Sequence, residues 1–267
     1  MDSQGNVYVA DSGNNRVQKF NSKGQFLSKW GTEGTNDEQF AMPKGIAVNS
    51  QGIVYVVDLN SRVQAFSATG QFLGKWGSLG NGDGQFATPG GIAVDSQGIV
   101  YVADIGNSRV QKFSGTGQFL GKWGSRGSGD GQFTFPQNLA VDSQDNIYVA
   151  DRGNDRVQKF SSSGTFIAKW GGYGSGDGLF DGPGGIAVDS QGNVYLADTG
   201  NNRVQKFSST GQFLGKWGSR GSGDGQFLSR WGSGITITVP GGIAVDSQDN
   251  IYVADIGNNR VQKFSQR

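Results

Sequence analysis

The sequence of 267 residues contains neither cysteine nor histidine. Without cysteine the chain can form no disulfide framework and offers no thiolate for catalysis or metal binding. A cysteine-free chain is compatible with either redox compartment. Without histidine, a general base would have to be aspartate or lysine, and no carboxylate pair stands apart from the others. The composition therefore favours a protein that is not an enzyme and that holds no metal or cofactor.

An excess of charge of one sign is also missing, since 23 lysine and arginine residues face 22 aspartate and glutamate residues. The field of the whole chain therefore steers no strongly charged partner. The basic residues are spread evenly rather than clustered, which argues against a nucleic-acid partner. No apolar run approaches 18 residues, so no segment is expected to span a membrane.

The sequence is instead rich in glycine, with 47 residues, and it repeats. A fixed period in the range of 20 to 50 residues is typical of solenoids, propellers and repeat arrays. One tyrosine recurs every 46 or 47 residues, with one interval of 57: Tyr8, Tyr55, Tyr101, Tyr148, Tyr195 and Tyr252.

Residues 184–218 contain the clearest copy of the repeat. It holds four short apolar runs, at 186–188, 194–197, 203–207 and 212–217, which are separated by aspartate, asparagine, serine and glycine. Short runs of β-branched and aromatic residues between turn residues predict strands joined by tight turns. Four antiparallel strands per repeat are the blade of a β-propeller. A β-solenoid is the alternative, although its repeats are usually shorter.

We predict an all-β fold, a six-bladed β-propeller of four-stranded antiparallel blades in a single domain. The first blade lacks its first run and the last blade lacks its fourth, so both are predicted to be incomplete. The predicted blades cover residues 1–31, 45–76, 91–123, 138–170, 185–217 and 242–264, and an extended linker covers 218–241.

The extended linker contains two segments that bear on the incomplete blades. QFLSRW (226–231) duplicates the fourth run, and ITITV (235–239) alternates like a strand. These residues form either a longer loop or a strand that completes a blade. Otherwise the strand edge at 260–264 stays unpaired, and such an edge can pair with another chain. We expect a monomer that can self-associate there, opposed by the charges of Arg260 and Lys263.

Met1 stands directly before DSQG, in the middle of a repeat. We therefore expect the natural chain to extend further upstream. The lack of a signal peptide then leaves the natural location unknown. We expect a soluble protein, and an extracellular or surface location is one alternative.

The repeated phrase resembles a known family. VYVADSGNNRVQKF (residues 7–20), with GIAVD before it and GQFLGKWG after it in other copies, is similar to the NHL repeat. The resemblance covers nearly all of the chain and implies a six-bladed propeller. It also implies a binding platform for protein or RNA. A minority of the family, the peptidyl-amidating lyases, use histidine ligands to a metal, and these cannot be carried over to a chain without histidine.

An aspartate and an arginine flank the turn between the second and third runs of each copy. We interpret them as structural, because a residue present in every blade is needed by the blade. The aspartate would cap the turn, and the arginine would cross the turn to pair with the aspartate or with backbone carbonyls. The pairs are Asp11 and Arg16, Asp58 and Arg62, Asp104 and Arg109, Asp151 and Arg156, Asp198 and Arg203, and Asp255 and Arg260.

The glycine-rich GSGDG loops resemble phosphate-binding loops only in composition, because no Lys-Ser/Thr pair and no helix follow them. Each loop has one aspartate and no second carboxylate at ligand spacing, which is too few for a calcium site of the usual kind. These aspartates are Asp83, Asp130, Asp177 and Asp224.

Chain order predicts which end of the blades carries function. The turn between runs two and three and the linker between blades lie at one end, opposite the two hairpin turns. Loops on a rigid scaffold are where binding residues tend to lie, and positions that differ among copies are the candidates. The candidate rim of the channel mouth consists of Ser12, Leu59, Ile105, Arg152, Thr199 and Ile256 after the aspartate, with Lys44 and Gln137 before the first run.

The leading hypothesis is a non-catalytic scaffold that holds a protein or peptide partner on this long-loop face. One alternative is a metal-dependent hydrolase or lyase with a site in the central channel. Another is a structural repeat subunit of an extracellular or surface assembly.

Overall fold

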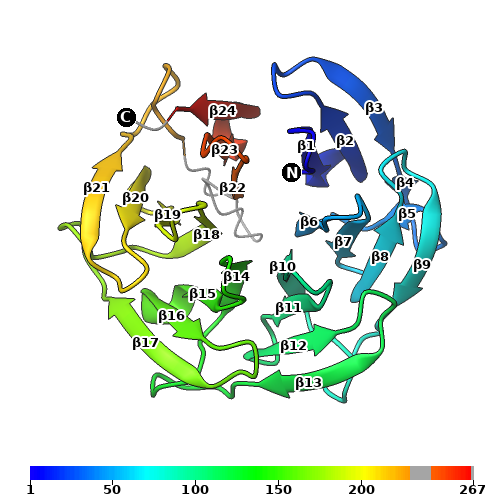
Figure 1. Cartoon of the computed structure of the whole chain (residues 1–267), viewed down its shortest axis with the longest axis horizontal. Coiled ribbons are helices and arrows are strands. Elements are labelled where there is room, and N and C mark those ends of the chain that lie inside the picture. The colour runs from blue at the N-terminus through cyan, green and yellow to red at the C-terminus, as the bar shows by residue number, and fades with distance from the viewer. Residues whose placement is uncertain (229–241, 266–267) are drawn as a thin grey trace. The chain divides into compact units, whose positions relative to one another are not determined.

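The computed structural model describes residues 1–228 and 242–265. Its strands form successive antiparallel sheets, and the fold is all-β, a six-bladed β-propeller (Figure 1). The chain divides into two compact units, Met1–Arg126 and Gly127–Arg267, and each contains three blades. The fold class predicted from the repeat is confirmed.

The first unit contains the first three blades. Its first linker also contains a short parallel pair, β4 (Thr32–Glu33) and β5 (Gln39–Phe40). The blades are β1 (Val7–Asp11), β2 (Arg16–Phe20) and β3 (Phe26–Trp30); β6 (Ile46–Val48), β7 (Val54–Asp58), β8 (Arg62–Phe66) and β9 (Phe72–Trp76); and β10 (Pro89–Val94), β11 (Val100–Asp104), β12 (Arg109–Phe113) and β13 (Phe119–Trp123).

The second unit contains the other three blades, which are β14 (Pro136–Val141), β15 (Ile147–Asp151), β16 (Arg156–Phe160) and β17 (Phe166–Gly171); β18 (Pro183–Val188), β19 (Val194–Asp198), β20 (Arg203–Phe207) and β21 (Phe213–Trp217); and β22 (Ile243–Val245), β23 (Ile251–Asp255) and β24 (Arg260–Phe264). Single 3₁₀ turns follow β1, β15 and β23, and these turns are η1 (Ser12–Asn14), η2 (Arg152–Asn154) and η3 (Ile256–Asn258). In the described part of the chain, no helix is long and apolar enough to cross a membrane.

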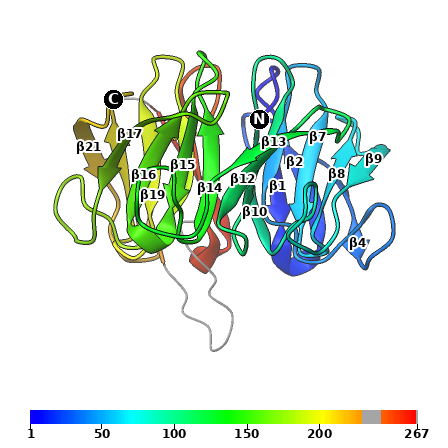
Figure 2. The ribbon, with the colours of Figure 1, turned by 90° about the horizontal axis from the view of Figure 1, so that it is seen from below.

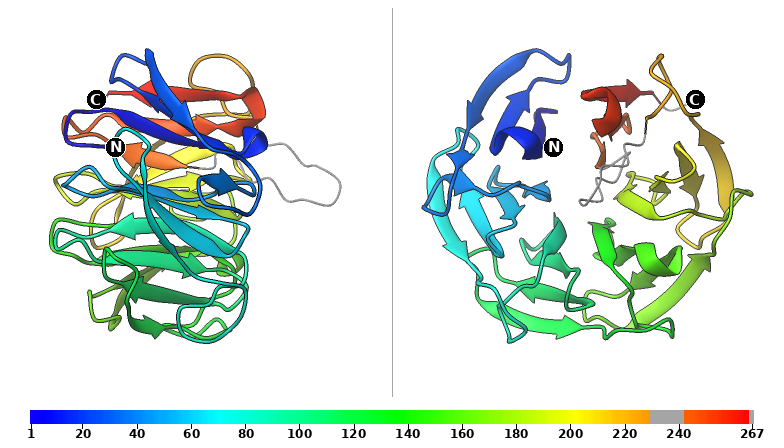
Figure 3. Two further views of the ribbon diagram at one scale, coloured as in Figure 1. Left: turned by 90° about the vertical axis from the view of Figure 1, so that its right-hand side faces the viewer. Right: turned by 180° about the vertical axis from the view of Figure 1, so that it is seen from behind.

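Within each blade the strands pair in chain order. Figure 1 labels the strands, and Figure 3 shows the same blades from behind. The second strand is the most apolar, and all five residues of β11 are buried. β-branched and aromatic side chains fit such a strand, which packs on both faces. The blade therefore has its core in its second and third strands, and the polar fourth strand covers one edge.

The turn between the first two strands is held by its own aspartate. In the third blade, one carboxylate oxygen of Asp95 accepts hydrogen bonds from the backbone N–H of Gln97 at 2.9 Å and of Ile99 at 2.8 Å. Its other oxygen accepts the hydroxyl of Tyr101 at 2.9 Å. Gly98 has a φ of +80°, which glycine adopts at little cost. The DSQG motif thus fixes a turn and also orients the repeated tyrosine.

Neighbouring blades of one unit pack through aromatic rings. The indole of Trp76 lies 5.9 Å from the ring of Tyr55 in its own blade and 6.0 Å from that of Phe113 in the next. The linker residue Phe86 is fully buried and lies 5.6 Å from Phe113. Aromatic rings at these separations attract one another beyond their burial. The tryptophans and linker phenylalanines therefore form the seams between blades.

The first and last blades each have three strands among the described residues, as predicted. The effect is clearest in β24, where Val261 is 42% exposed, whereas Val204 at the same place in β20 is fully buried. In the complete blade, Val204 pairs with Trp217 of the fourth strand. Among the residues that the structure describes, no strand pairs with the outer edge of β24, and self-association through this edge stays a prediction.

The duplicated segment 226–231 begins as a linker rather than as a strand. Phe227 is fully buried and lies 6.1 Å from Phe264, as the other linker phenylalanines lie against their blades. It also forms a parallel bridge with Arg220. The segment ITITV (235–239) and the rest of the extended linker from 229 to 241 lie outside the described residues.

Replacing Gly117 by alanine should destabilise the protein more than replacing Gly98. Both glycines have positive φ, +90° and +80°, so both substitutions carry a backbone cost of about 1 to 2 kcal/mol. A Cβ on Gly117 would also lie 2.7 Å from the indole of Trp76, whereas a Cβ on Gly98 meets nothing within 4 Å. Urea unfolding should show an added loss of about 1 to 3 kcal/mol for Gly117→Ala. Equal losses would mean that the indole moves freely.

Backbone amides of β24 should exchange with deuterium faster than those of β20. The two strands have the same sequence, but β24 has one neighbouring strand among the described residues and β20 has two. An open edge leaves alternate amides without a strand partner, and protection falls with local stability. Peptide-resolved exchange on 260–264 and 203–207 checks this. Equal protection would mean that another segment covers the edge.

Candidate functional site

The turns after the second strands and the linkers between blades lie at the same end of the strands in each unit, which we call the linker end (Figure 2). Backbone hydrogen bonds join the two. In the fourth blade the N–H of Gly153 donates to the carbonyl of Thr134 at 2.7 Å, and in the fifth that of Gly200 donates to Asp181 at 2.8 Å. The variable turn residue is therefore held beside the linker that precedes its blade.

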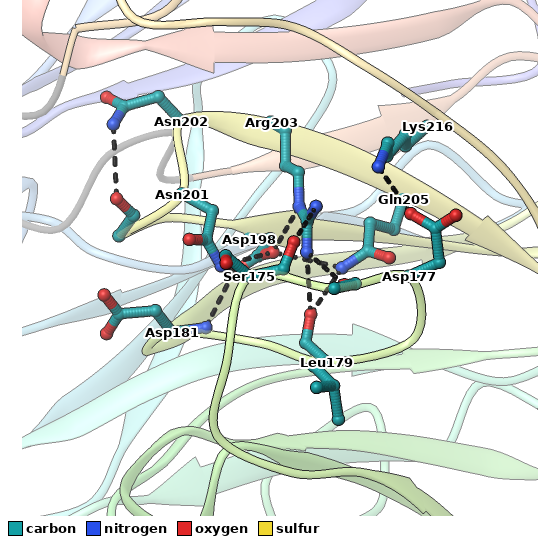
Figure 4. A network of polar contacts seen from close by, with 12 residues as sticks. Ser175, Asp177, Leu179, Asp181, Asp198, Asn201, Asn202, Arg203, Gln205 and Lys216 are labelled. Atoms are coloured by element: carbon teal, nitrogen blue, oxygen red, sulfur yellow. Dashed lines mark hydrogen bonds and ion pairs between the residues drawn. The ribbon is translucent and has the colours of Figure 1, made fainter.

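The repeated arginine binds the linker as well as the aspartate (Figure 4). In the fifth blade, Nε of Arg203 donates to the carboxylate of Asp198 at 2.7 Å. Its Nη atoms donate to the backbone carbonyls of Ser175 at 2.7 Å, Gly176 at 2.8 Å and Leu179 at 2.9 Å. A guanidinium has a fixed fork of five N–H donors and suits this planar set of acceptors. One side chain thus holds three points of the linker.

Two amide side chains extend this contact. Gln205 donates to the carbonyl of Leu179 at 2.7 Å and to Asp198 at 3.0 Å. Asn201 donates to the carbonyl of Gly174 at 2.9 Å. The carboxylate of Asp198 in turn accepts the backbone N–H of Asp181 at 2.8 Å. We call the repeated Asp, Asn, Arg and Gln of one blade its linker clamp.

The aspartate and arginine of the clamp recur in the other blades, with departures in the first, second and sixth. In the sixth blade the side chain of Arg260 is 28% exposed. In the first blade Arg16 donates to Asp11 at 2.7 Å, but its side chain is 29% exposed. In the second blade the turn is one residue shorter, and Arg62 lies 3.4 Å from Asp58. Burial raises the pKa of Asp58, although Arg62 and Asn60 oppose this. The other clamp pairs lie at 2.7 to 2.9 Å: Asp104 and Arg109, Asp151 and Arg156, Asp198 and Arg203, and Asp255 and Arg260.

Three of the four aspartates of the glycine-rich loops form ion pairs with lysines of the fourth strands, whereas Asp224 lies 3.7 Å from Arg260. Asp130 lies 2.5 Å from Lys169, and Asp177 lies 2.5 Å from Lys216. These pairs are about half exposed, so they add little stability. Among the described residues, no three His, Cys, Asp or Glu side chains form a group that could hold a metal ion.

The structure separates the predicted rim residues by exposure. Leu59 is 38% exposed and Ile256 is 40% exposed, whereas Thr199 is buried. The hydroxyl of Ser12 donates to the backbone carbonyl of Pro43. Lys44 is exposed, and Ile105, Arg152 and Gln137 are half-buried. The binding role of all eight positions stays a prediction.

The exposed apolar residues of the linkers were not among the sequence candidates. Tyr173 is 78% exposed, Leu79 is 75% exposed and Phe135 is 56% exposed. The signal was present, because the place of Tyr173 holds glutamate, leucine or arginine in other linkers and the place of Phe135 holds methionine, threonine or glycine. Variation within an otherwise copied linker marks these positions, but their exposure depends on how the linker folds.

The family model for the NHL repeat matches five segments of the chain. They are residues 1–20, 86–113, 133–160, 180–207 and 238–264. Together with the six antiparallel blades, these matches decide the family. This chain is an NHL-repeat β-propeller. A comparison of this chain with curated protein sequences found no match.

Solved structures similar to the NHL propeller show the same fold at low identity. A streptogramin B lyase is 14% identical with a TM-score of 0.65, covering 98% of this chain and 76% of its own. A protein of unknown function from Bacteroides thetaiotaomicron is 17% identical with a TM-score of 0.68, covering 98% and 67%. A chain of a nidogen/laminin complex is 17% identical with a TM-score of 0.61, covering 80% and 75%. The likeness shows the fold alone.

Removing the clamp arginine should lower the free energy of unfolding much more in a complete clamp than in the first blade. Arg109 is almost fully buried against Asp104, so Arg109→Ala leaves a buried carboxylate without its ion pair and removes a donor from three linker carbonyls. We expect a loss of about 3 to 5 kcal/mol. Arg16→Ala is the matched control and should cost less than about 1 kcal/mol, because that pair is partly exposed. Urea unfolding measures both, and similar losses would contradict the clamp.

Proposed function

We propose that the NHL propeller is a non-catalytic binding scaffold whose linker end holds a protein or peptide partner. One observation carries the proposal. Phe135 exposes a large aromatic ring at the linker end from a backbone conformation that disfavours it.

Phe135 has a φ of +55°, in the left-handed region. A bulky residue in this region is an outlier, and the conformation costs about 1 to 2 kcal/mol. The equivalent residues are Met42, Thr88 and Gly182, with φ of +47°, +52° and +58°. Gly182 shows that the fold needs no side chain at this position. The ring of Phe135 is 56% exposed, so core packing does not account for it. Strain of this kind is typical of functional sites.

Arg152 lies beside this aromatic residue. Its backbone N–H donates to the carbonyl of Phe135 at 3.3 Å. Burial lowers the pKa of Arg152, and the carboxylates of Asp181 and Asp155 oppose this by raising it. An arginine stays charged throughout the physiological range. Aromatic and arginine side chains are enriched among the residues that dominate protein interfaces. The pair therefore supports a protein or peptide partner.

The other exposed linker residues support the same kind of partner. Leu79 and Tyr173 occupy equivalent places in two linkers, and both are largely exposed. A scaffold whose clamp residues are copied and whose linker residues vary can change its partner without changing its fold. A chain with this fold occurs in a nidogen/laminin complex, which is an interaction between proteins.

Replacing Phe135 by glycine separates binding from stability. Glycine relieves the left-handed strain, as at Gly182, so the melting temperature should not fall. Peptides selected from a random linear library on the wild-type chain should bind Phe135→Gly at least about tenfold more weakly, because a buried aromatic anchor contributes more than about 1.4 kcal/mol. Fluorescence anisotropy with the selected peptides measures this.

The matched control is Thr88→Gly, which relieves the same backbone strain in another blade and keeps the aromatic ring. It should bind the selected peptides as the wild type does. Alanine at Leu59, Ile105 and Arg152 forms a second series, expected to weaken the same peptides with melting temperature unchanged. The proposal would be overturned if Phe135→Gly and the three alanine substitutions all left the affinity of the selected peptides unchanged. Failure of the library to yield any enriched peptide would also overturn it.

A further inference from the structure

The repeated tyrosine has a lysine as its cross-strand partner in five blades and an alanine in the second. Tyr8 pairs with Lys19 and Tyr148 with Lys159, whereas Tyr55 pairs with Ala65. The pairs lie at the end of the strands opposite the linkers, which we call the hairpin end. The second blade is therefore the place to ask what replaces the lysine.

The lysine lies over the tyrosine ring in four blades, and in the first and fourth it also contacts a carboxylate and a carbonyl of the next blade. Nζ of Lys159 lies 4.9 Å from the ring centroid of Tyr148 and 3.7 Å from the carboxylate of Asp142. It also donates to the backbone carbonyl of Ser209 in the next blade, at 3.4 Å. An ammonium over an aromatic face, beside a carboxylate and a carbonyl, has its charge well satisfied. This arrangement defines an ammonium site between two blades.

The first blade repeats these contacts within the other unit. Nζ of Lys19 lies 5.0 Å from the ring centroid of Tyr8 and 3.8 Å from Asp2, and it donates to the carbonyl of Ala68 at 3.2 Å. The carbonyl equivalent to Ala68 in the following blade is that of Gly115. Gly115 therefore presents the acceptor that a lysine at position 65 would reach.

The second blade has a cavity at this place. Its volume is about 270 Å³, and Asn49, Gln51, Tyr55, Gln97, Gly98 and Gly115 are among the residues that line it. Asn49, Tyr55 and Gly115, which are equivalent to the three groups around Lys159, all line the cavity, and Ala65 does not. The hydroxyl of Tyr55 donates to the carbonyl of Gly115 at 3.2 Å. A carbonyl oxygen has two lone pairs, so this acceptor can take a second donor.

The second blade also differs at the carboxylate. Asn49 stands where the other blades have aspartate, and its side-chain oxygen still accepts the N–H of Gln51 at 3.0 Å and of Ile53 at 2.8 Å. The turn is thus kept while the charge is removed. A half-buried carboxylate here would have no lysine beside it, and an unpaired charge in such a place is costly. Asn49 therefore allows the cavity to exist without its lysine.

We propose that the cavity beside Tyr55 binds a primary alkylammonium group, which takes the place of the lysine missing at position 65. The ligand would lay three or four methylene groups along the tyrosine ring and donate to the carbonyl of Gly115. Two sources have this chemistry, a free alkylamine and the lysine side chain of a protein partner. The site lies at the hairpin end, and it does not depend on the function proposed for the linker end.

The probe is n-butylamine at neutral pH, titrated into the full chain. Saturable shifts of the backbone amide signals of Gly98 and Gly115 in NMR spectra report binding. We expect a Kd on the order of 1 mM, because a ligand of five heavy atoms has few contacts. Capped lysine is the second arm. Binding of both ligands assigns the site to a lysine side chain, and binding of butylamine alone assigns it to a free amine.

Two substitutions test the mechanism in opposite directions. Ala65→Lys supplies the ammonium from the chain and should abolish the butylamine shifts. Asn49→Asp restores the carboxylate and should tighten butylamine binding by about tenfold, as a charge-assisted hydrogen bond would. The double variant Asn49→Asp with Ala65→Lys rebuilds the arrangement of the other blades, so it should fold and bind no butylamine.

Neutral and bulky probes complete the design. n-Pentanol is one carbon longer than butylamine and carries no charge. Tetramethylammonium carries the charge but has no N–H donor. Both should bind at least about tenfold more weakly than butylamine. Equal binding of pentanol, the lack of a saturable shift with butylamine, or butylamine shifts that persist in the double variant would each overturn the proposal.

Discussion

In each complete clamp of this propeller, a guanidinium is buried beside a carboxylate and donates to backbone carbonyls of a linker. The linker has little regular structure of its own beyond a short parallel pair or bridge, so its other polar backbone groups need partners wherever they are buried. Arg203 supplies three of these partners, and Asp198 and Gln205 supply others. Because the same set recurs, the path of the chain from blade to blade is held by side-chain hydrogen bonds as well as by strand pairing.

This arrangement separates two kinds of position at the linker end. Clamp residues must keep their chemistry, since each donor and acceptor is used. Neighbouring positions such as Phe135 and Tyr173 make no contribution to the clamp through their side chains, so they can vary. The second blade shows the same separation at the hairpin end, where Asn49 keeps the hydrogen bonds of the turn although the charge has been lost.

Much of the fold could be predicted from the repeat alone. The short apolar runs and the turn residues between them place the strands, and counting copies gives the number of blades. The lack of a fourth run in the last copy also agrees with the three strands described for that blade, in which Val261 is exposed. The pairing of Asp198 with Arg203 could be anticipated from their common turn. The carbonyls that Arg203 also binds lie 24 to 28 residues earlier in the chain, and no pattern within one copy points to them.

The candidate site was less accessible to sequence reasoning. Chain order places the rim positions, but it does not tell that Thr199 is buried and Leu59 exposed. The left-handed backbone of Phe135 follows from the fold of a linker that has few strand contacts. The cavity beside Tyr55 could not be predicted from the sequence. Its prediction needs the direct pairing of position 65 with position 55 on neighbouring strands, and the place of Gly115 of the next blade in the cavity wall.

The clamp also shows where one repeat ends and the next begins. Three of the five segments that match the family model, 86–113, 133–160 and 180–207, start at the linker phenylalanine and stop at the end of the third strand. Each of these segments contains the clamp residues of its blade, but the linker carbonyls that the arginine binds lie before it. For Arg203 they are the carbonyls of Ser175, Gly176 and Leu179. A unit counted from the start of a linker to the end of the following blade holds both the arginine and the carbonyls that it binds. Such a unit contains the contact that joins one blade to the next.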